Sequence, residues 1–292
     1  MGLARLSTRA VIGVEAPAVA VEVHLAGGLP AMTIVGMAET AVKESRDRVR
    51  SALLNSRFDF PASRITVNLA PADLPKGGGR YDLAIALGIL VASGQLPADS
   101  LVDTEVMGEL SLSGALRPVS GALPAAMAAR TAGHRLLLPA DNADEIALLP
   151  DCEAIAADHL LTLCGHLRGQ APLDAVACAR PEPERTGPDM SDIRGQPQAR
   201  KALEVAAAGG HNLLFFGPPG TGKTLLASRL PGILPRLTDD EALEVAAIQS
   251  ISGQSVRWAE RPFRAPHHTC SGVALVGGGV RITNSLEYSR ID

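Results

Sequence analysis

The chain has 292 residues, of which 46% are hydrophobic and 20% charged, and its formal net charge is −4. This length is sufficient for two domains with separate cores, and the composition excludes a disordered chain. The small negative charge excludes a uniformly basic surface but is compatible with a local basic patch. No apolar run approaches 18 residues and no apolar signal segment follows Met1, so we expect a cytoplasmic protein without a membrane span.

The four cysteines form no C-x-x-C pair and have no histidine at ligand spacing. Such a pattern is typical of reduced thiols in a cytosolic protein rather than of a disulfide framework or a zinc site. We therefore expect mostly buried, reduced side chains at Cys152, Cys164, Cys178 and Cys270.

Residues 1–167 alternate short β-like runs with helical patterns, which predicts an α+β domain. Strands are expected at residues 19–25, 32–36, 64–69 and 134–138. Helices are expected at residues 39–55, 83–92 and 122–132. A hairpin is expected where residues 106–112 and 116–119 flank a serine-glycine turn.

Residues 168–190 are rich in Pro, Glu, Arg and Gly and show no periodicity. This composition predicts a solvated linker and places a domain boundary there. The second domain then occupies residues 191–292.

The second domain begins with a helix expected at residues 199–208, which ends at two glycines. Residues 213–216 form a short apolar run that is typical of a buried parallel strand. A helix is expected from 225 to 230, where Pro231 would end it. Thr238 and Glu241 have the spacing of a capping box, which predicts a helix over 242–248.

Between the expected strand and helix lies a segment that fits the phosphate-binding pattern G-x-x-x-x-G-K-[ST]. Its members are Gly217, Pro218, Pro219, Gly220, Thr221, Gly222, Lys223 and Thr224. The glycines allow backbone N–H groups to turn inward around a polyphosphate, and the helix start adds a favourable dipole. Lys223 is expected to reach the β- and γ-phosphates, and the Thr224 hydroxyl to hold Mg²⁺. The sequence therefore predicts an NTP-binding site.

Several motifs of the chain resemble the YifB/ComM group of magnesium-chelatase-like AAA+ ATPases. In the second domain these are residues 192–196, 206–211, 217–224, 261–269 and 273–279. Residues 34–37 and 68–77 look like the Lon-protease-like domain, of ribosomal S5 domain 2-like fold, that precedes the ATPase module in this group. The resemblance covers residues 1–279 and implies an α/β P-loop AAA+ domain after the α+β domain.

The resemblance also implies that ATP lies between Ile193 and the phosphate loop, with Ile193 and Gly195 near the adenine. It further implies a homo-hexameric, DNA-associated motor, linked to helicase or branch-migration activity in recombination and to competence for natural transformation. Composition shows neither the hexamer nor the DNA partner.

One departure from the group's pattern concerns hydrolysis. After residue 224 no run of four apolar residues is followed by Asp-Glu, so the Walker B carboxylates that organise Mg²⁺ and water are missing from this sequence. We expect an incomplete AAA+ domain, from a truncated or frameshifted product, that binds ATP weakly at best and does not hydrolyse it. Residues 280–292 follow a different pattern from the group.

Other candidate sites have weaker support. A peptidase is not expected, because residues 77–82 offer no serine nucleophile and no lysine lies between Gly77 and Arg200. His267 and His268 have no acidic or cysteine partner at ligand spacing, so a structural role is favoured over a metal site.

Three alternatives stay open. Residues 77–80 are either a phosphate-contacting loop or a plain turn. Arg46, Arg48 and Arg50 form either a solvated helix face or a phosphate-binding patch. The whole protein is a DNA motor, a metal-chelatase motor subunit or a non-enzymatic interaction module, although chelatase motor subunits lack a Lon-like half.

Overall fold

The computed structural model describes residues 2–36, 44–182, 188–266 and 269. The chain divides into two compact units. The N-terminal unit holds the residues up to Arg180 together with Ala247–Val256, and the second unit holds Pro181–Ala246 and the described residues from Arg257 onward. Within the described ranges, no helix is both long and apolar enough to cross a lipid bilayer.

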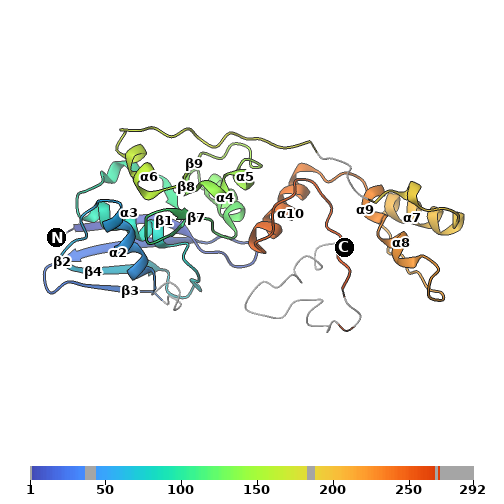
Figure 1. Ribbon diagram of the computed structural model, residues 1–292, viewed down its shortest axis with the longest axis horizontal. Coiled ribbons are helices and arrows are strands. Elements are labelled where there is room, and N and C mark those ends of the chain that lie inside the picture. Colours follow the sequence, from blue (N-terminus) through green and yellow to red (C-terminus); the bar gives the residue numbers. More distant parts are fainter. Residues whose placement is uncertain (1, 37–43, 183–187, 267–268, 270–292) are drawn as a thin grey trace. The chain divides into compact units, whose positions relative to one another are not determined.

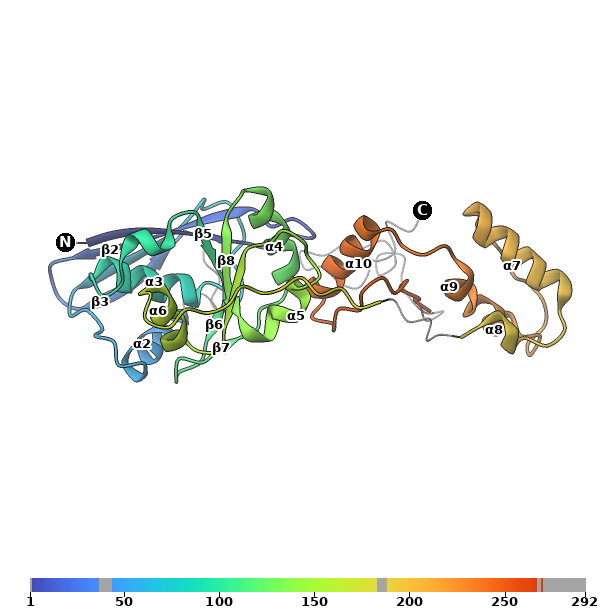
Figure 2. The ribbon, with the colours of Figure 1, turned by 90° about the horizontal axis from the view of Figure 1, so that it is seen from above.

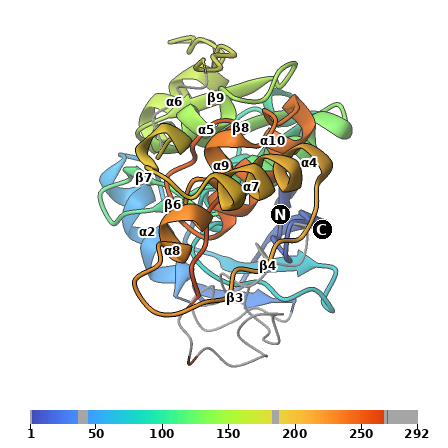
Figure 3. The same ribbon diagram turned by 90° about the vertical axis from the view of Figure 1, so that its right-hand side faces the viewer.

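A seven-stranded mixed sheet forms the centre of the N-terminal unit, in the order β3-β4-β2-β1-β5-β8-β9. Its strands are β1 (Gly2–Arg9), β2 (Ala18–Ala26), β3 (Ala31–Val35), β4 (Arg64–Ala70), β5 (Thr104–Val106), β8 (Arg135–Pro139) and β9 (Ala154–Ala157). Strand β2 runs antiparallel to both β1 and β4, and the other four pairings are parallel. Figure 3 shows β3 and β4 toward one end of this sheet and β8 and β9 toward the other. The unit is therefore a mixed α/β domain with a mostly parallel sheet.

One helix, α3 (Asp82–Ala92), supplies much of the core of this unit. Its residues from Asp82 to Leu90 are all buried, because the helix packs across β1 and β2 and has α2 (Ser45–Asn55) beside it (Figures 1 and 2). A Cβ at Gly88 would lie 2.6 Å from Val23 Cγ2, so glycine is needed for this close approach. Burial of a continuous apolar helix against a sheet is a main source of stability for the fold.

The remaining elements of the unit are short. They are α4 (Ala122–Thr131), α5 (Ala143–Ile146), α6 (Leu160–Leu167), the 3₁₀ turns η1 (Ala98–Leu101) and η2 (Ala140–Asn142), and the two-stranded hairpin β6 (Glu109–Leu110) and β7 (Leu116–Arg117). Helix α4 packs on β8 and α5.

The structure confirms the predicted strands at 19–25, 32–36, 64–69 and 134–138 and the predicted helices at 83–92 and 122–132. Of the helix expected over 39–55, the structure describes α2 from Ser45 onward, and residues 39–43 lie outside the described residues. The predicted hairpin was wrong in extent. Val106 ends β5 in the central sheet, and Gly108, with φ of +158°, separates it from the short hairpin β6–β7.

The first part of the predicted linker is bonded to the N-terminal unit. Val176 N donates to Ala154 O and Ala179 N donates to Ala147 O, each at 2.8 Å. These two bonds hold this part of the segment against the N-terminal unit, while most of residues 171–180 are exposed to solvent. Residues 183–187 lie outside the described part of the chain.

Two of the three arginines of α2 contact residues of other parts of the N-terminal unit. Arg48 donates to the buried carboxylate of Asp82, and the Arg50 guanidinium stacks 4.7 Å from the centre of the Phe60 ring. Arg46 forms an exposed pair with the neighbouring Asp47. Because two of the three cations are engaged inside the unit, the alternative of a phosphate-binding patch on α2 loses its support.

The glycine segment 77–79 is anchored at both ends by inward-pointing cations. Lys76 is buried, and its ammonium donates to the carbonyls of Gly36 and Leu74 at 3.0 Å and to that of Pro71. Burial lowers the pKa of Lys76. Arg80 is also buried, and its Nη2 donates to Ser120 O at 3.1 Å. Of the two alternatives for residues 77–80, a folded turn therefore agrees with the structure better than a phosphate-contacting loop.

The cysteine side chains differ in burial. Cys164 is buried, and this burial raises its pKa to about 12. Cys152 is half-buried and Cys178 is exposed, so the expectation of mostly buried thiols was wrong for Cys178. Cys270 lies outside the described residues.

The second unit has a small core formed by Met190, Ile193, Leu203 and Leu226. Around it pack the 3₁₀ turn η3 (Met190–Asp192) and the helices α7 (Pro197–Gly209), α8 (Lys223–Ala227) and α9 (Leu230–Ile233), shown in Figure 1. The prediction that Pro231 ends the helix was wrong. The helix ends at Ala227, and Pro231 lies in the first turn of α9, where its missing N–H is tolerated.

The predicted capping box is confirmed at the start of α10 (Asp239–Ile251). Thr238 N donates to Glu241 Oε2 at 2.7 Å, and Glu241 N donates to Thr238 Oγ1 at 3.3 Å. The hydrogen bond from the Thr238 backbone lowers the pKa of Glu241.

Candidate functional site

The phosphate-loop candidate, residues 217–224, is an exposed turn that leads into α8. Gly217, Gly220 and Gly222 have φ values of +146°, +79° and +85°. Residues with a side chain rarely adopt these backbone angles, so glycine is needed at these three positions for the loop to have this conformation. Gly222 is the N-cap residue of α8, which begins at Lys223.

The Lys223 ammonium folds back over the loop that precedes it. Its Nζ donates to Gly217 O at 2.9 Å, to Pro218 O at 2.7 Å and to Thr221 Oγ1 at 3.3 Å. Thr221 Oγ1 in turn donates to Pro218 O at 3.0 Å. These bonds hold one positive charge against residues 217–221 of the loop.

Ile193 and Gly195, which are predicted to lie near the adenine, belong to the second unit, and Ile193 is part of its core. Ile193 is only 4% exposed and packs with Met190, Leu203 and Leu226, so its side chain serves the core. Its carbonyl accepts from Arg200 Nη1 at 3.4 Å. Gly195 is exposed with φ of +74°, and the chain then enters α7. Contact between these residues and an adenine stays a prediction.

Residues 213–216 are not a strand, and this prediction was wrong for the structure. Leu214 is 83% exposed and Phe216 is 90% exposed, and the described residues of the second unit contain no strand beside them. A parallel strand requires a hydrogen-bonded neighbour, and an apolar run without one stays irregular.

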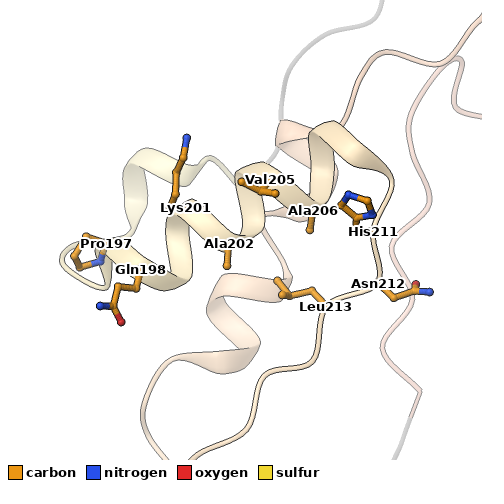
Figure 4. A pocket seen from close by; sticks show the side chains of 9 residues that line it. All are labelled: Pro197, Gln198, Lys201, Ala202, Val205, Ala206, His211, Asn212 and Leu213. Atoms are coloured by element: carbon orange, nitrogen blue, oxygen red, sulfur yellow. The ribbon is translucent and has the colours of Figure 1, made fainter.

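The same segment borders a hollow of about 640 Å³ along one side of α7 (Figure 4). Its lining is mainly apolar and includes Val205 and Leu213 together with the polar residues Lys201, His211 and Asn212. None of the predicted ATP ligands lines this hollow. We therefore place the candidate site at the loop 217–224 and not in the hollow.

For a metal, the loop offers the hydroxyl of Thr224, which is exposed in the first turn of α8. Within the part of the chain that the structure describes, no group of three His, Cys, Asp or Glu side chains could hold a metal ion. One hydroxyl fits Mg²⁺ only together with phosphate and water oxygens, as is usual for Mg²⁺ bound with a nucleotide. His267 and His268 lie outside the described residues.

Sequence reasoning missed a set of polar contacts between η3 and the residue that follows α8. The side chain of Arg229, which follows α8, donates to Asp192 Oδ2 at 3.0 Å. Asp192 also accepts from Asp189 N at 3.2 Å, as part of a capping box around η3. The spacing Asp189-x-x-Asp192 is a visible cap signal, whereas no local pattern connects Asp192 with Arg229.

Two family models match the chain. One, described as subunit ChlI of Mg-chelatase, matches residues 21–142, and the other, described as magnesium chelatase, subunit ChlI, matches residues 189–287. The uncharacterized protein YifB of Salmonella typhimurium is 53% identical over 283 residues, and the competence protein ComM of Haemophilus influenzae is 51% identical over 287 residues. Each alignment covers 96% of this chain.

The chain belongs to the YifB/ComM family of magnesium-chelatase-like proteins. It spans 56% of the length of each of these two relatives. The Lon protease of Syntrophomonas wolfei is 25% identical over 207 residues, which cover 63% of this chain and 24% of that protease. The predicted family and the Lon-like relationship are thus both found in the comparisons.

Proposed function

We propose that this YifB/ComM family chain binds ATP and Mg²⁺ through the loop 217–224, as part of a motor that acts on DNA. The observation that carries the proposal is the Lys223 ammonium, held over a turn of three glycines with positive φ. Backbone N–H groups, a lysine and a hydroxyl are the groups that bind the phosphates and Mg²⁺ in P-loop proteins. ATP would supply a triphosphate for the loop and oxygens for Mg²⁺ beside Thr224.

Lys223→Ala is expected to weaken ATP binding by about 10- to 100-fold, because a hydrogen-bonded charge typically contributes about 1.5 to 3 kcal/mol. Titration of a fluorescent ATP analogue in the presence of Mg²⁺ measures this change. The matched control is Lys201→Ala, since Lys201 is exposed on α7 and paired with Glu204. Binding is measured rather than turnover, because the predicted role of Lys223 concerns the affinity for the phosphates.

Equal ATP affinity of the Lys223→Ala variant and the unmodified chain would contradict the proposed site. Steady hydrolysis by the unmodified chain that is lost in Lys223→Ala would keep the site and overturn the expectation that this chain does not hydrolyse ATP.

The DNA part of the proposal is supported by family membership and by the name of one relative, a competence protein. With a net charge of −4, binding would depend on a local basic surface. We expect the full-length ComM relative to shift a four-way DNA junction at low salt and to bind a linear duplex of equal length less tightly. Affinity should fall steeply as salt rises, because phosphate contacts release counterions. No gel shift of the junction at low salt would contradict DNA binding.

A metal-chelatase motor subunit is the second candidate, because both family models carry that description. The similarity to the competence protein ComM over 96% of this chain, together with the similarity to Lon protease, favours the DNA motor. An ATP-dependent association with partner subunits, without any binding to DNA, would favour the chelatase alternative.

A further inference from the structure

Two segments of the second unit that are far apart in the sequence are joined next to α8, the helix that begins at the end of the phosphate loop. The first is η3 and the residues after it, including Ile193 and Gly195. The second is α8 and the residue that follows its end, Arg229. Arg229 Nη2 donates to Asp192 Oδ2 at 3.0 Å, across 37 positions of sequence.

Both partners of this pair are fixed by further bonds. Arg229 Nη1 donates to Ser228 Oγ at 2.9 Å, and Ser228 N donates to Thr224 O at 3.0 Å, which ties the guanidinium to the last turn of α8. On the other side, Asp192 Oδ2 also accepts from Asp189 N. The Arg229 side chain is 15% exposed and that of Asp192 is 49% exposed, so the pair is only partly screened by water.

An apolar contact lies beside the ion pair. Ile193, next to Asp192, and Leu226, in α8, belong to the same buried cluster. The backbone after Asp192 and the helix that begins at Lys223 are therefore connected twice, once by charge and once by packing. This double connection holds Asp192 and Ile193 beside α8, whose first residue, Lys223, belongs to the phosphate-loop motif.

We propose that the Asp192–Arg229 pair is a positioning element of the nucleotide site, which holds the segment for the base at a set distance from the loop for the phosphates. This inference rests on the proposed ATP site and extends it to two residues that would not touch the nucleotide. If the fold already holds the segment for the base and the loop for the phosphates in place, ATP binds both without ordering them first. Prior ordering avoids an entropic cost and therefore makes the free energy of ATP binding more favourable.

The test compares ATP with inorganic tripolyphosphate, which engages the loop alone. Asp192→Asn and Arg229→Gln are each expected to weaken ATP binding by about 5- to 10-fold, which is the range for a partly buried charged hydrogen bond. Tripolyphosphate affinity is expected to stay as in the unmodified chain. The double variant with Asp192→Arg and Arg229→Asp is expected to regain most of the ATP affinity, because it restores the opposite charges.

Glu204→Gln is the matched control, since Glu204 forms an exposed pair with Lys201 on α7 of the same unit. Thermal unfolding of each variant checks that the second unit is folded. Loss of ATP and tripolyphosphate binding to the same extent, or unchanged ATP binding in both single variants, would overturn the positioning role while Lys223→Ala still reports on the site. If the unmodified chain binds neither ligand, the proposed function fails and the inference fails with it.

Discussion

Glu105→Ala is expected to lower the free energy of unfolding of the N-terminal unit by about 3 to 5 kcal/mol, the range for breaking a buried ion pair. Glu105 lies in β5 and is 1% exposed. Its carboxylate accepts from Arg9 Nε and Nη2, each at 2.6 Å, and lies 2.9 Å from His134 Nδ1. Removal of the carboxylate leaves the Arg9 charge buried without its counter-ion, which is the main cost.

Arg9 cannot easily turn outward in this variant, because its guanidinium also donates to the carbonyls of Ala16 at 3.0 Å and Ala128 at 3.2 Å. Urea unfolding of the full chain, with hydrogen exchange followed in peptides from β1 and β5, measures the effect. The control is Asp47→Ala in the exposed pair with Arg46, which should cost less than about 1 kcal/mol. Equal effects of the two variants would show that the Arg9–Glu105 pair adds no stability.

Replacement of both partners gives a further check. Arg9→Met combined with Glu105→Leu should cost clearly less than Glu105→Ala alone, because no buried charge is left unpaired. A double variant that is less stable than Glu105→Ala would contradict this explanation of the cost.

Asp82→Ala is expected to cost about 3 to 4 kcal/mol in the same unit, because the half-buried Arg48 loses its hydrogen-bonded counter-charge and the buried Leu110 N–H loses its acceptor. Asp82 is fully buried at the start of α3. Its carboxylate accepts from Arg48 Nε at 2.7 Å and Nη2 at 3.2 Å, and from Leu110 N at 3.2 Å. One carboxylate thus joins α2, α3 and the hairpin β6–β7. The Asp82 hydrogen bond also raises the pKa of Arg48.

The measurement is a double-mutant cycle with Arg48→Ala, read by urea unfolding of the full chain. The two single variants should each be strongly destabilised, and the double variant should lose less than their sum, because the residues form one pair. Arg46→Ala on the same helix is the control and should change stability by less than about 1 kcal/mol. Additive losses at Arg48 and Asp82 would contradict the pairing.

Several features could be predicted from the sequence because they depend on residues close together in the chain. The capping box of Thr238 and Glu241, the glycine-rich turn before Lys223 and the apolar helix α3 all follow from spacings of a few residues. Strands β2, β3 and β4 were visible as runs rich in β-branched residues, and β8 was visible as an apolar run. Strand β9 was missed, because its four residues, Ala154–Ala157, are too few and too rich in alanine to stand out without the pairing with β8.

Residues 213–216 illustrate the opposite case. Their composition is typical of a buried strand, yet the run is exposed and irregular, because hydrogen-bonded neighbours decide whether an apolar run becomes a strand. The arginines of α2 show the same dependence on tertiary contacts. Their spacing suggested one cationic face, but Asp82 and Phe60 engage Arg48 and Arg50 from elsewhere in the chain.

The sequence by itself determined the family, the phosphate-loop motif and most of the local elements, since backbone preference and short spacings control these features. Only the tertiary structure decided which charges are buried and paired. Arg9 meets Glu105 across 96 positions, Arg48 meets Asp82 across 34, and Asp192 meets Arg229 across 37. No local pattern encodes such pairs, because only the folded backbone brings their partners together. Burial of the carboxylates of Glu105 and Asp82 then makes a paired cation necessary at those two sites.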